Sequence, residues 1–285
     1  MSLLRRFRRQ IDRRRQSVSP RKKPTPTTRP RRALLEPLEP RILLDAEMSF
    51  TMSAAAHDLT LRMDDVEGVD TLQLVNNDDP VPDAQVIVSQ RLAETTGVVI
   101  HGSELADALR IDFADSFSLE NGIRFLDAFF GDGDTLQVDG KSNVWHLTGK
   151  DRGEVDAPDA VAFEGVENLA GGGAEDIFAL EQGAGVSGTI DGGAGDDTLD
   201  YSGFATDVTV DLQNRTATGI GGFAGIQAVV GGAGSDVLVG PDADIDWHID
   251  AMNAGRVAGV GFFGIENLLA GAGDDTFVFS DGSGV

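Results

Sequence analysis

The chain has 285 residues, no cysteine, 36 glycines, 6% aromatic residues and a formal net charge of −24. The lack of cysteine excludes disulfides and thiolate metal sites, and there is no apolar run of about 18 residues that would indicate a transmembrane helix. A glycine-rich chain with short apolar runs is typical of many turns and short strands.

The charge is unevenly distributed along the chain. Residues 1–46 carry 14 basic and 4 acidic residues, whereas residues 47–285 carry 9 basic and 43 acidic residues, a net charge of −34. So much like charge destabilises a compact state by self-repulsion. We therefore expect bound cations, high salt or a long solvated surface to offset it. The same charge excludes nucleic acid as a partner of the acidic part.

Residues 1–33 are basic and rich in proline and threonine, as in "SVSPRKKPTPTTRPRR". This composition cannot bury apolar surface and predicts a disordered tail. The basic start is not followed by the apolar segment of a secretory or twin-arginine signal peptide. Nothing in it therefore indicates export by the Sec route.

The next segment, "LLEPLEPRILLDA" at residues 34–46, is by itself an amphipathic linker broken by two prolines. Within it, "LEPRILLDA" resembles the LEPR-XLL segment, an N-terminal element of very large bacterial repeat proteins. The resemblance implies an exported or surface protein in which this segment serves sorting. The matching residues are Leu38, Glu39, Pro40, Arg41, Leu43 and Leu44.

Residues 47–130 alternate short apolar and β-branched runs with Asp, Gly and Asn turns, which predicts short strands. We expect this β-rich region to form the first turns of a solenoid. "SELADAL" (103–109) is the only helix candidate, and it is short. The expected strands are "HDLTLRM", "DTLQLV", "AQVIVSQ", "GVVIHG", "ALRIDF" and "GIRFLDAFF".

From about residue 131 the chain repeats itself. "DTLQVDGKSNVWHL" (134–147) matches "DVLVGPDADIDWHI" (236–249) at an offset of 102, and residues 163–186 match residues 262–285 at an offset of 99. The three-residue difference predicts a variable loop between the Trp block and the Phe block. "FAGIQAVVGGAGSDVLVG" (223–240) is a further copy of the Phe block.

The second copy stops at Val285, where the first copy continues into "SGTIDGGAGDDTLD". We therefore expect residues 131–285 to be a repeat region that is truncated mid-repeat, in a fragment of a longer chain. The alternative is a natural terminus with an exposed strand edge and no capping repeat.

Short glycine–aspartate segments recur within these repeats. "GGAGDDTLD" (192–200) and "GGAGSDVLV" (231–239) fit the nonapeptide G-G-x-G-x-D-x-U-x, in which U is a large apolar residue. "AGAGDDTFV" (270–278) and "GGGAEDIFA" (171–179) each lack one of the three motif glycines. "FFGDGDTLQ" (129–137) is more degenerate: it keeps the Asp-x-Leu spacing, but its two glycines stand at other positions.

The pattern resembles the RTX (repeats-in-toxin) calcium-binding repeats. That resemblance implies a parallel β-roll in which the glycine half forms a turn and the apolar U side chain points inward. The aspartate and turn carbonyls would hold Ca²⁺, which takes 6–8 oxygen ligands, and glycine lets carbonyls converge. The candidate metal residues are Asp197, Asp236, Asp275, Asp176, Asp196, Gly192, Gly195, Gly231 and Gly234.

One departure keeps a second interpretation open. RTX repeats usually follow one another directly, whereas these nonapeptides lie tens of residues apart. Only "GAGVSGTID" (183–191) precedes another nonapeptide directly, and it lacks the aspartate. The alternative is a set of structural glycine turns with solvating acids and no metal. "DADID" (242–246) is a weaker calcium candidate, for which a charged turn is the simpler interpretation.

Catalytic signatures are absent: there is no G-x-S-x-G, H-E-x-x-H or dinucleotide fingerprint. His57 and His101 have no evident nucleophile partner in the sequence. The repeated Trp-His pairs, at Trp145 and Trp247, favour packing over zinc binding because they occupy equivalent repeat positions. We therefore expect no enzymatic activity from this chain.

The sequence predicts an all-β protein built of parallel β-solenoid or β-roll-like repeats, preceded by a disordered basic tail. Its expected function is that of an exported calcium-binding repeat protein with an adhesion or extracellular-matrix role, at the cell surface or secreted. Its expected partners are calcium and extracellular surface or matrix components. One alternative is the N-terminal part of a giant exported enzyme or toxin with its catalytic domain further along; another is a metal-free structural solenoid.

Overall fold

The computed structural model describes residues 46–53, 55, 57–78, 85–129 and 131–285. All of them belong to one compact unit, Leu43–Val285. The predicted disordered tail at 1–33 lies outside the described residues, as does the LEPR-XLL-like segment apart from Ala46.

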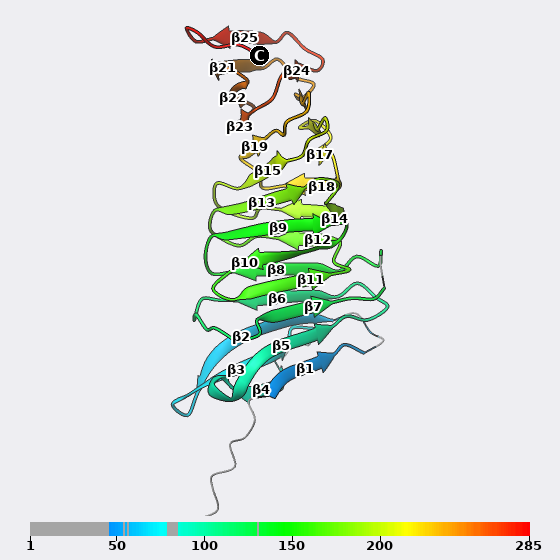
Figure 1. Cartoon of the computed structure of the whole chain (residues 1–285), viewed down its shortest axis with the longest axis vertical. Helices are drawn as coiled ribbons and strands as arrows, with labels where there is room; N and C mark the ends of the chain where they lie inside the picture. The colour runs from blue at the N-terminus through cyan, green and yellow to red at the C-terminus, as the bar shows by residue number, and fades with distance from the viewer. Residues whose placement is uncertain (1–45, 54, 56, 79–84, 130) are drawn as a thin grey trace, which may run out of the picture. The chain divides into compact units, whose positions relative to one another are not determined.

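The described residues form a stack of β-coils in which the chain alternates between two long sheets (Figure 1). One sheet, called here sheet A, contains in spatial order β1 (Ala46–Thr51), β5 (Thr95–His101), β7 (Ile123–Leu126), β11 (Ala160–Glu164), β10 (Arg152–Asp156), β9 (Asn143–Gly149), β13 (Asp176–Glu181), β15 (Thr198–Gly203), β19 (Ala228–Val230), β23 (Val260–Phe263), β22 (Ala254–Val257), β21 (Asp246–Ala251) and β25 (Thr276–Phe279).

The other sheet, sheet B, contains in spatial order β24 (Asn267–Leu269), β20 (Val237–Val239), β16 (Thr209–Asp211), β17 (Thr216–Ala217), β18 (Ile220–Ala224), β14 (Val186–Asp191), β12 (Asn168–Ala170), β8 (Thr135–Asp139), β6 (Ala108–Asp112), β2 (Asp58–Val66), β3 (Val69–Asn76) and β4 (Gln85–Arg91). The six strands expected between residues 47 and 130 correspond to β2 through β7.

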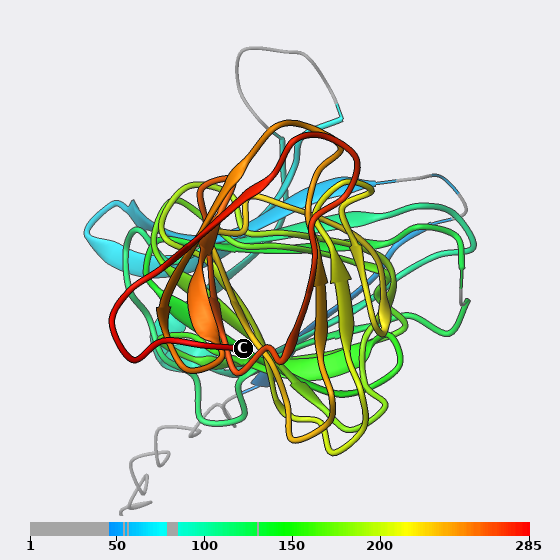
Figure 2. The same ribbon diagram turned by 90° about the horizontal axis from the view of Figure 1, so that it is seen from above.

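Successive coils pair in parallel and in register, so equivalent apolar residues stack along the interior. In sheet B, Leu136 pairs with Leu109 on one side and Leu169 on the other. In sheet A, Phe178 pairs with Trp145 and Leu199. Figure 2 looks along the stack and shows the coils superposed around this common interior. The prediction of an all-β fold with parallel solenoid-like repeats is confirmed.

Antiparallel excursions interrupt the parallel stack. β9, β10 and β11 form an antiparallel meander within sheet A, and β21, β22 and β23 form another. In sheet B, β16, β17 and β18 do the same. The chain moves ahead along the stack and then doubles back before continuing. These excursions separate the nonapeptides in sequence although neighbouring coils still touch in space.

The sequence repeat corresponds to a structural repeat. Trp145 stacks on Phe178 with ring centroids 5.3 Å apart, and Trp247 stacks on Phe277 at 5.5 Å. Both tryptophans are fully buried, which confirms that they serve packing. The three-residue difference lies where the last two meander strands join: five residues separate Val155 from its partner Val161, whereas two residues separate Val257 from its partner Val260.

The helix expected at residues 103–109 is wrong. Those residues form a bend followed by the first residues of β6, because Asp107 accepts the backbone N–H of Ser103 at 2.6 Å and closes a turn instead. A single short 3₁₀ helix, η1 (Leu92–Glu94), occurs among the described residues. In the same part of the chain, no helix is long and apolar enough to cross a membrane.

Candidate functional site: the glycine–aspartate turns

The glycine–aspartate turns lie where the chain crosses from one sheet to the other. Asp176, Asp197 and Asp275 directly precede or begin the sheet A strands β13, β15 and β25, whereas Asp236 precedes β20 of sheet B. The candidate metal residues are therefore distributed over two rows of turns along the stack, and they do not meet in one centre.

Close packing explains the first glycine of each nonapeptide. A Cβ on Gly192 would collide with the carbonyl oxygen of Gly225 in the next coil and with the Asp197 carboxylate. Gly231 has the same relation to Gly264 and to Asp236. In the first of these nonapeptides Gly195 serves the turn itself, since it has a φ of +133°, a conformation that side-chain-bearing residues rarely adopt.

The aspartate of the nonapeptide faces backbone amides. Asp176 accepts the N–H groups of Asn143 at 2.9 Å and of Gly172 at 3.0 Å, one on each carboxylate oxygen. Asp236 likewise accepts Val208 at 2.8 Å and Gly232 at 2.6 Å. Both side chains are fully buried. At these two turns the carboxylate satisfies amides that would otherwise be buried without partners, and hydrogen bonds to a charged group each contribute about 1.5–3 kcal/mol.

The amide of each such acid also donates to a side-chain oxygen of the next coil, and because the acceptor is an acid at every step except Gln227, we call this arrangement the acid ladder. On one row Asp107 N–H donates to Asp134, and Asp134 N–H donates to Glu167. On the other row Asp176 N–H donates to Asp197 at 2.8 Å. The remaining rungs are Asp197 to Gln227 and Asp236 to Glu266. The acid ladder joins coils through side chains as the sheets join them through backbone.

Asp197 is capped on only one oxygen. Its Oδ1 accepts the amide of Asp176, but its Oδ2 is buried without a hydrogen-bond partner. The amide of Gly193, which could cap it, donates to Asp191 Oδ1 at 3.0 Å instead. Burial raises the pKa of Asp197, and the charges of Asp176, Asp191 and Asp196 raise it further. Asp275 also has a buried oxygen without a partner, Oδ1.

The turn at residues 242–246 uses its acids in a similar way. Asp242 Oδ1 accepts the amide of Ala272 at 2.8 Å, and Asp244 Oδ1 accepts the amide of Asp274 at 2.9 Å. These bonds to the next coil agree with the interpretation of "DADID" as a charged turn.

A second group of acids lies between β7 and β8. One carboxylate oxygen from each of Asp127, Asp132 and Asp134 lies within 4.8 Å of those from the other two. Burial, and then a hydrogen bond with Asp127, raise the pKa of Asp134 to about 9. Sequence reasoning noted Asp134 only as part of a degenerate nonapeptide and did not consider Asp127 or Asp132. The run Gly131-Asp132-Gly133-Asp134 was the available signal.

The turn at Asp107 was not identified from the sequence. It has no glycine–glycine pair, yet Asp107 accepts the amides of His57 at 2.8 Å and Ser103 at 2.6 Å, as the nonapeptide aspartates do. The only remaining signal is the Asp-x-Leu spacing to Leu109, which is fully buried in β6.

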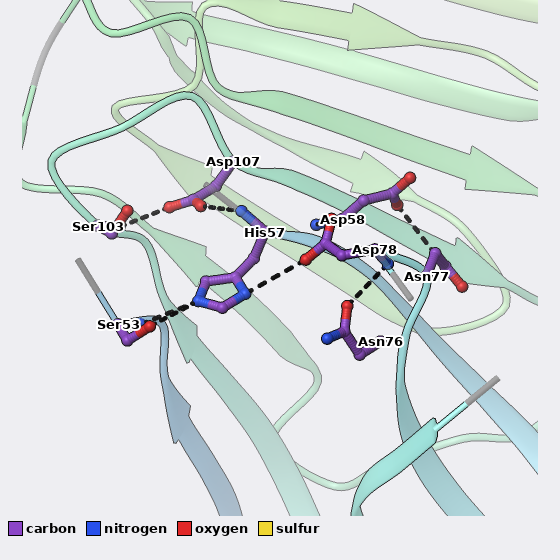
Figure 3. Close-up of polar contacts among 8 residues, drawn as sticks. All are labelled: Ser53, His57, Asp58, Asn76, Asn77, Asp78, Ser103 and Asp107. Atoms are coloured by element: carbon purple, nitrogen blue, oxygen red, sulfur yellow. Dashed lines mark hydrogen bonds and ion pairs between the residues drawn. The ribbon is translucent and has the colours of Figure 1, made fainter. Parts of the chain in front are cut away.

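The structure corrects the statement that His57 has no nucleophile partner (Figure 3). Ser53 Oγ lies 2.9 Å from His57 Nε2, and Asp78 Oδ2 lies 3.5 Å from His57 Nδ1. The Ser53 amide also donates to Nε2, at 3.3 Å. Because this amide hydrogen points at the imidazole, it is not free to stabilise an oxyanion. The network ties the segment before β2 to the segment after β3.

Comparison with known proteins gives one match. Residues 181–284 match the family model described as Peptidase M10 serralysin C terminal. This is a glycine/aspartate repeat region of the RTX type, so the RTX resemblance is supported for this part of the chain. The match contains the turns of Asp197, Asp236 and Asp275, whereas Asp176 and the group at residues 127–134 precede it. No curated protein and no solved structure matches the chain.

The matched part corresponds to the C-terminal region of those peptidases and includes no catalytic domain. It therefore assigns no peptidase activity to this chain. The absence of enzymatic activity, the LEPR-XLL assignment and the role of individual metal residues remain predictions.

Proposed function

We propose that this chain is part of an exported calcium-binding repeat protein with a structural or adhesive role at the cell surface or in the extracellular matrix. The observation that carries the proposal is a coincidence of two features. The part of the chain that matches an RTX-type family contains Asp197, whose buried carboxylate keeps one oxygen without a partner among neighbouring acids.

Among the predicted metal residues, Asp197 is the strongest candidate ligand. Its Oδ2 is unpartnered, and Asp176, Asp191 and Asp196 add negative charge around it. A bound Ca²⁺ would supply the positive charge that this group lacks and would join the coils of β13 and β15. Asp275 follows, with one unpartnered oxygen. Asp176 and Asp236 are weaker candidates because both of their oxygens already accept amides.

The charge of residues 47–285 gives calcium a second role in this proposal. A net charge of −34 opposes compaction, so the repeats would be least stable where Ca²⁺ is scarce and would gain order on reaching a calcium-rich exterior. Binding free energy of a metal that only the folded state binds adds to folding free energy.

A metal-free structural solenoid is the second candidate function. The complete amide capping of Asp176 and Asp236 favours it, because those turns are satisfied by hydrogen bonds within the protein. Calcium dependence separates the two candidates.

The test is a Ca²⁺ titration of the full chain after treatment with chelator, followed by far-ultraviolet circular dichroism and thermal unfolding, with Mg²⁺ as the control ion. We expect Ca²⁺ to stabilise the fold by about 2.7 kcal/mol at a hundred-fold excess over Kd. Asp197→Asn should remove much of this gain, whereas Asp250→Asn, at an exposed position in β21, should keep it. Equal stability in chelator and in Ca²⁺ would favour the metal-free solenoid.

A further inference from the structure

The acids between β7 and β8 differ from the nonapeptide turns in position and in composition. Asp127 directly follows β7, and Asp132 stands where the nonapeptide motif has its third glycine. The group lies before the part of the chain that matches the RTX-type family. Calcium binding by the repeat turns would therefore say nothing about this group.

Four carboxylate oxygens in the group are buried without a hydrogen-bond partner outside it. Asp127 accepts the amide of Phe129 on Oδ1 at 3.1 Å, and Asp134 accepts the amide of Asp107 on Oδ1 at 2.8 Å. The Oδ2 atoms of both residues and both oxygens of Asp132 have no hydrogen-bond partner in another part of the chain, and within the group the carboxyls of Asp127 and Asp134 hydrogen-bond each other. Asp127 is 4% exposed and Asp134 is 0% exposed, so water does not replace the missing partners freely, and an unpaired buried charge is costly.

The surrounding backbone holds these carboxylates in place. The Glu167 carboxylate accepts the amides of Gly131 at 2.8 Å, Gly133 at 3.2 Å and Asp134 at 3.0 Å. These three loop amides are therefore directed at Glu167 and not at the carboxylates of Asp132 and Asp134.

Two glycines in neighbouring coils make room for Asp127. A Cβ on Gly102 would lie 3.0 Å from Asp127 Cγ, and a Cβ on Gly165 would collide with the Asp127 carbonyl oxygen. The carboxylate thus occupies a close-fitting space between the coils above and below, which restricts the directions in which it can turn.

The described residues offer the group no compensating basic side chain. Among the described residues, no lysine, arginine or histidine forms an ion pair with Asp127, Asp132 or Asp134, and Glu167 and Asp107 add further negative charge nearby. Ca²⁺ binds carboxylate oxygens at about 2.3–2.6 Å, so opposite ligands lie up to roughly 5 Å apart. The three oxygens lie within 4.8 Å of one another, close enough for one ion to contact all of them.

We propose that Asp127, Asp132 and Asp134 bind one divalent cation, with Ca²⁺ preferred over Mg²⁺, at a site separate from the four nonapeptide turns between residues 171 and 278. Mg²⁺ requires shorter bonds of about 2.0–2.1 Å and near-ideal octahedral geometry, which three carboxylates from a glycine loop and a neighbouring strand end fit less well. The ion would fix the crossing from β7 to β8.

The test combines ion counting with a local measurement on the full chain. Equilibrium dialysis against Ca²⁺ gives the number of ions bound per chain, and hydrogen exchange with mass spectrometry reports the amides of residues 127–139. We expect Ca²⁺ at millimolar concentration to slow exchange in that segment at least tenfold, and Mg²⁺ at the same concentration to slow it less.

Asp132→Asn is the decisive variant, because both Asp132 oxygens are unpartnered and its removal breaks no hydrogen bond. It should lose one bound ion and the protection of residues 127–139 while keeping any calcium response of residues 181–284. Asp115→Asn, an exposed acid in the connection after β6, is the matched control and should behave as the parent chain.

Other outcomes are equally informative. Unchanged ion number and protection in Asp132→Asn would overturn the proposed site, whatever happens in residues 181–284. Equal protection by Mg²⁺ and Ca²⁺ would overturn the stated preference. Loss of the calcium response in Asp197→Asn alone, with residues 127–139 still protected by Ca²⁺, would support both sites as independent.

Discussion

Asp176 and Asp134 both stand at the aspartate position of a glycine–aspartate turn, and both are fully buried. Asp176 accepts an amide on each carboxylate oxygen. Asp134 accepts one amide and directs its other oxygen into a group of acids. The same residue at the same place in the motif thus stabilises backbone in one turn and leaves an open ligand position in another.

The difference comes from the length and composition of the connection. The turn before Asp176 supplies its own capping amide from Gly172. In the connection before Asp134, the amides of Gly131 and Gly133 donate to Glu167. Asp197 is intermediate, because the amide of Gly193 donates to Asp191 and not to Asp197. An aspartate in this motif is therefore a cap or a candidate ligand according to where the neighbouring amides point.

The largest expected effect is that of removing a fully capped acid. Asp176→Ala leaves the amides of Asn143 and Gly172 buried without an acceptor, and each such donor costs about 1–3 kcal/mol. The free energy of unfolding in chelator should fall by roughly 2–6 kcal/mol, measured by urea denaturation. A loss well below this range would show that the carboxylate is not the cap described here.

The close contact between coils gives the next largest effect. Gly192→Ala places a Cβ against the Gly225 carbonyl and the Asp197 carboxylate, and overpacking of this kind costs about 1–3 kcal/mol. Gly173→Ala is the matched control, because a Cβ there meets no atom within 4 Å. Thermal unfolding of the two variants should separate them clearly; similar midpoints would contradict the packing argument.

Asp134→Asn should have a smaller effect of the opposite sign. The folded-state pKa of Asp134, about 9, lies above the ordinary value of 3.8. Its stabilising contribution is therefore complete below pH 3.8 and is lost as the pH rises through about 9, at no more than about 1.4 kcal/mol per pH unit.

Asparagine keeps an acceptor for the Asp107 amide and can donate to Asp127, so in chelator Asp134→Asn should be as stable as the parent near pH 4 and increasingly more stable than the parent toward pH 9. Denaturant unfolding across this pH range checks it. The same variant should lose calcium binding at residues 127–134. A parent chain whose stability rises with pH in chelator would contradict the prediction.

The smallest effect is expected at a partly exposed acid. Asp211 accepts the amide of Asn214 at 2.9 Å, and this hydrogen bond lowers its pKa. A lowered pKa contributes stability above the ordinary value that is lost as the pH falls through the folded-state value. Asp211→Ala should change stability by less than about 1 kcal/mol, with any loss confined to neutral pH. Thermal unfolding at pH 3 and pH 7 provides the measurement.

The sequence contained the elements of the fold but not their arrangement. Alternation located the strands β2 to β7, and the nonapeptides located the turns at Asp197 and Asp236. The doubling back at β10 and β11 could not be predicted, because a strand in a meander and a strand in a parallel coil show the same alternation. The repeat offset showed only that the connection after β10 varies in length.

The candidate sites were predictable to a similar degree. The motif identifies Asp176 and Asp197 equally, but the capping of one and the open oxygen of the other depend on amides from adjacent coils. Asp127 was not identifiable, because it approaches Asp132 and Asp134 only after the chain crosses between sheets. Contacts between residues that no fixed spacing relates cannot be read from a motif.

The doubling back of the chain has a consequence for the order in which the stack can assemble. β9 pairs with β10 and β13 but not with β7, and the two positions between β7 and β9 are filled by β11 and β10, which come later in the chain. A chain that emerges from its N-terminus therefore cannot add one strand at a time. Sheet A can grow beyond β7 only once Glu164, the end of β11, is available, and β9, β10 and β11 are then added together. Elongation of this solenoid therefore proceeds in steps set by its meanders.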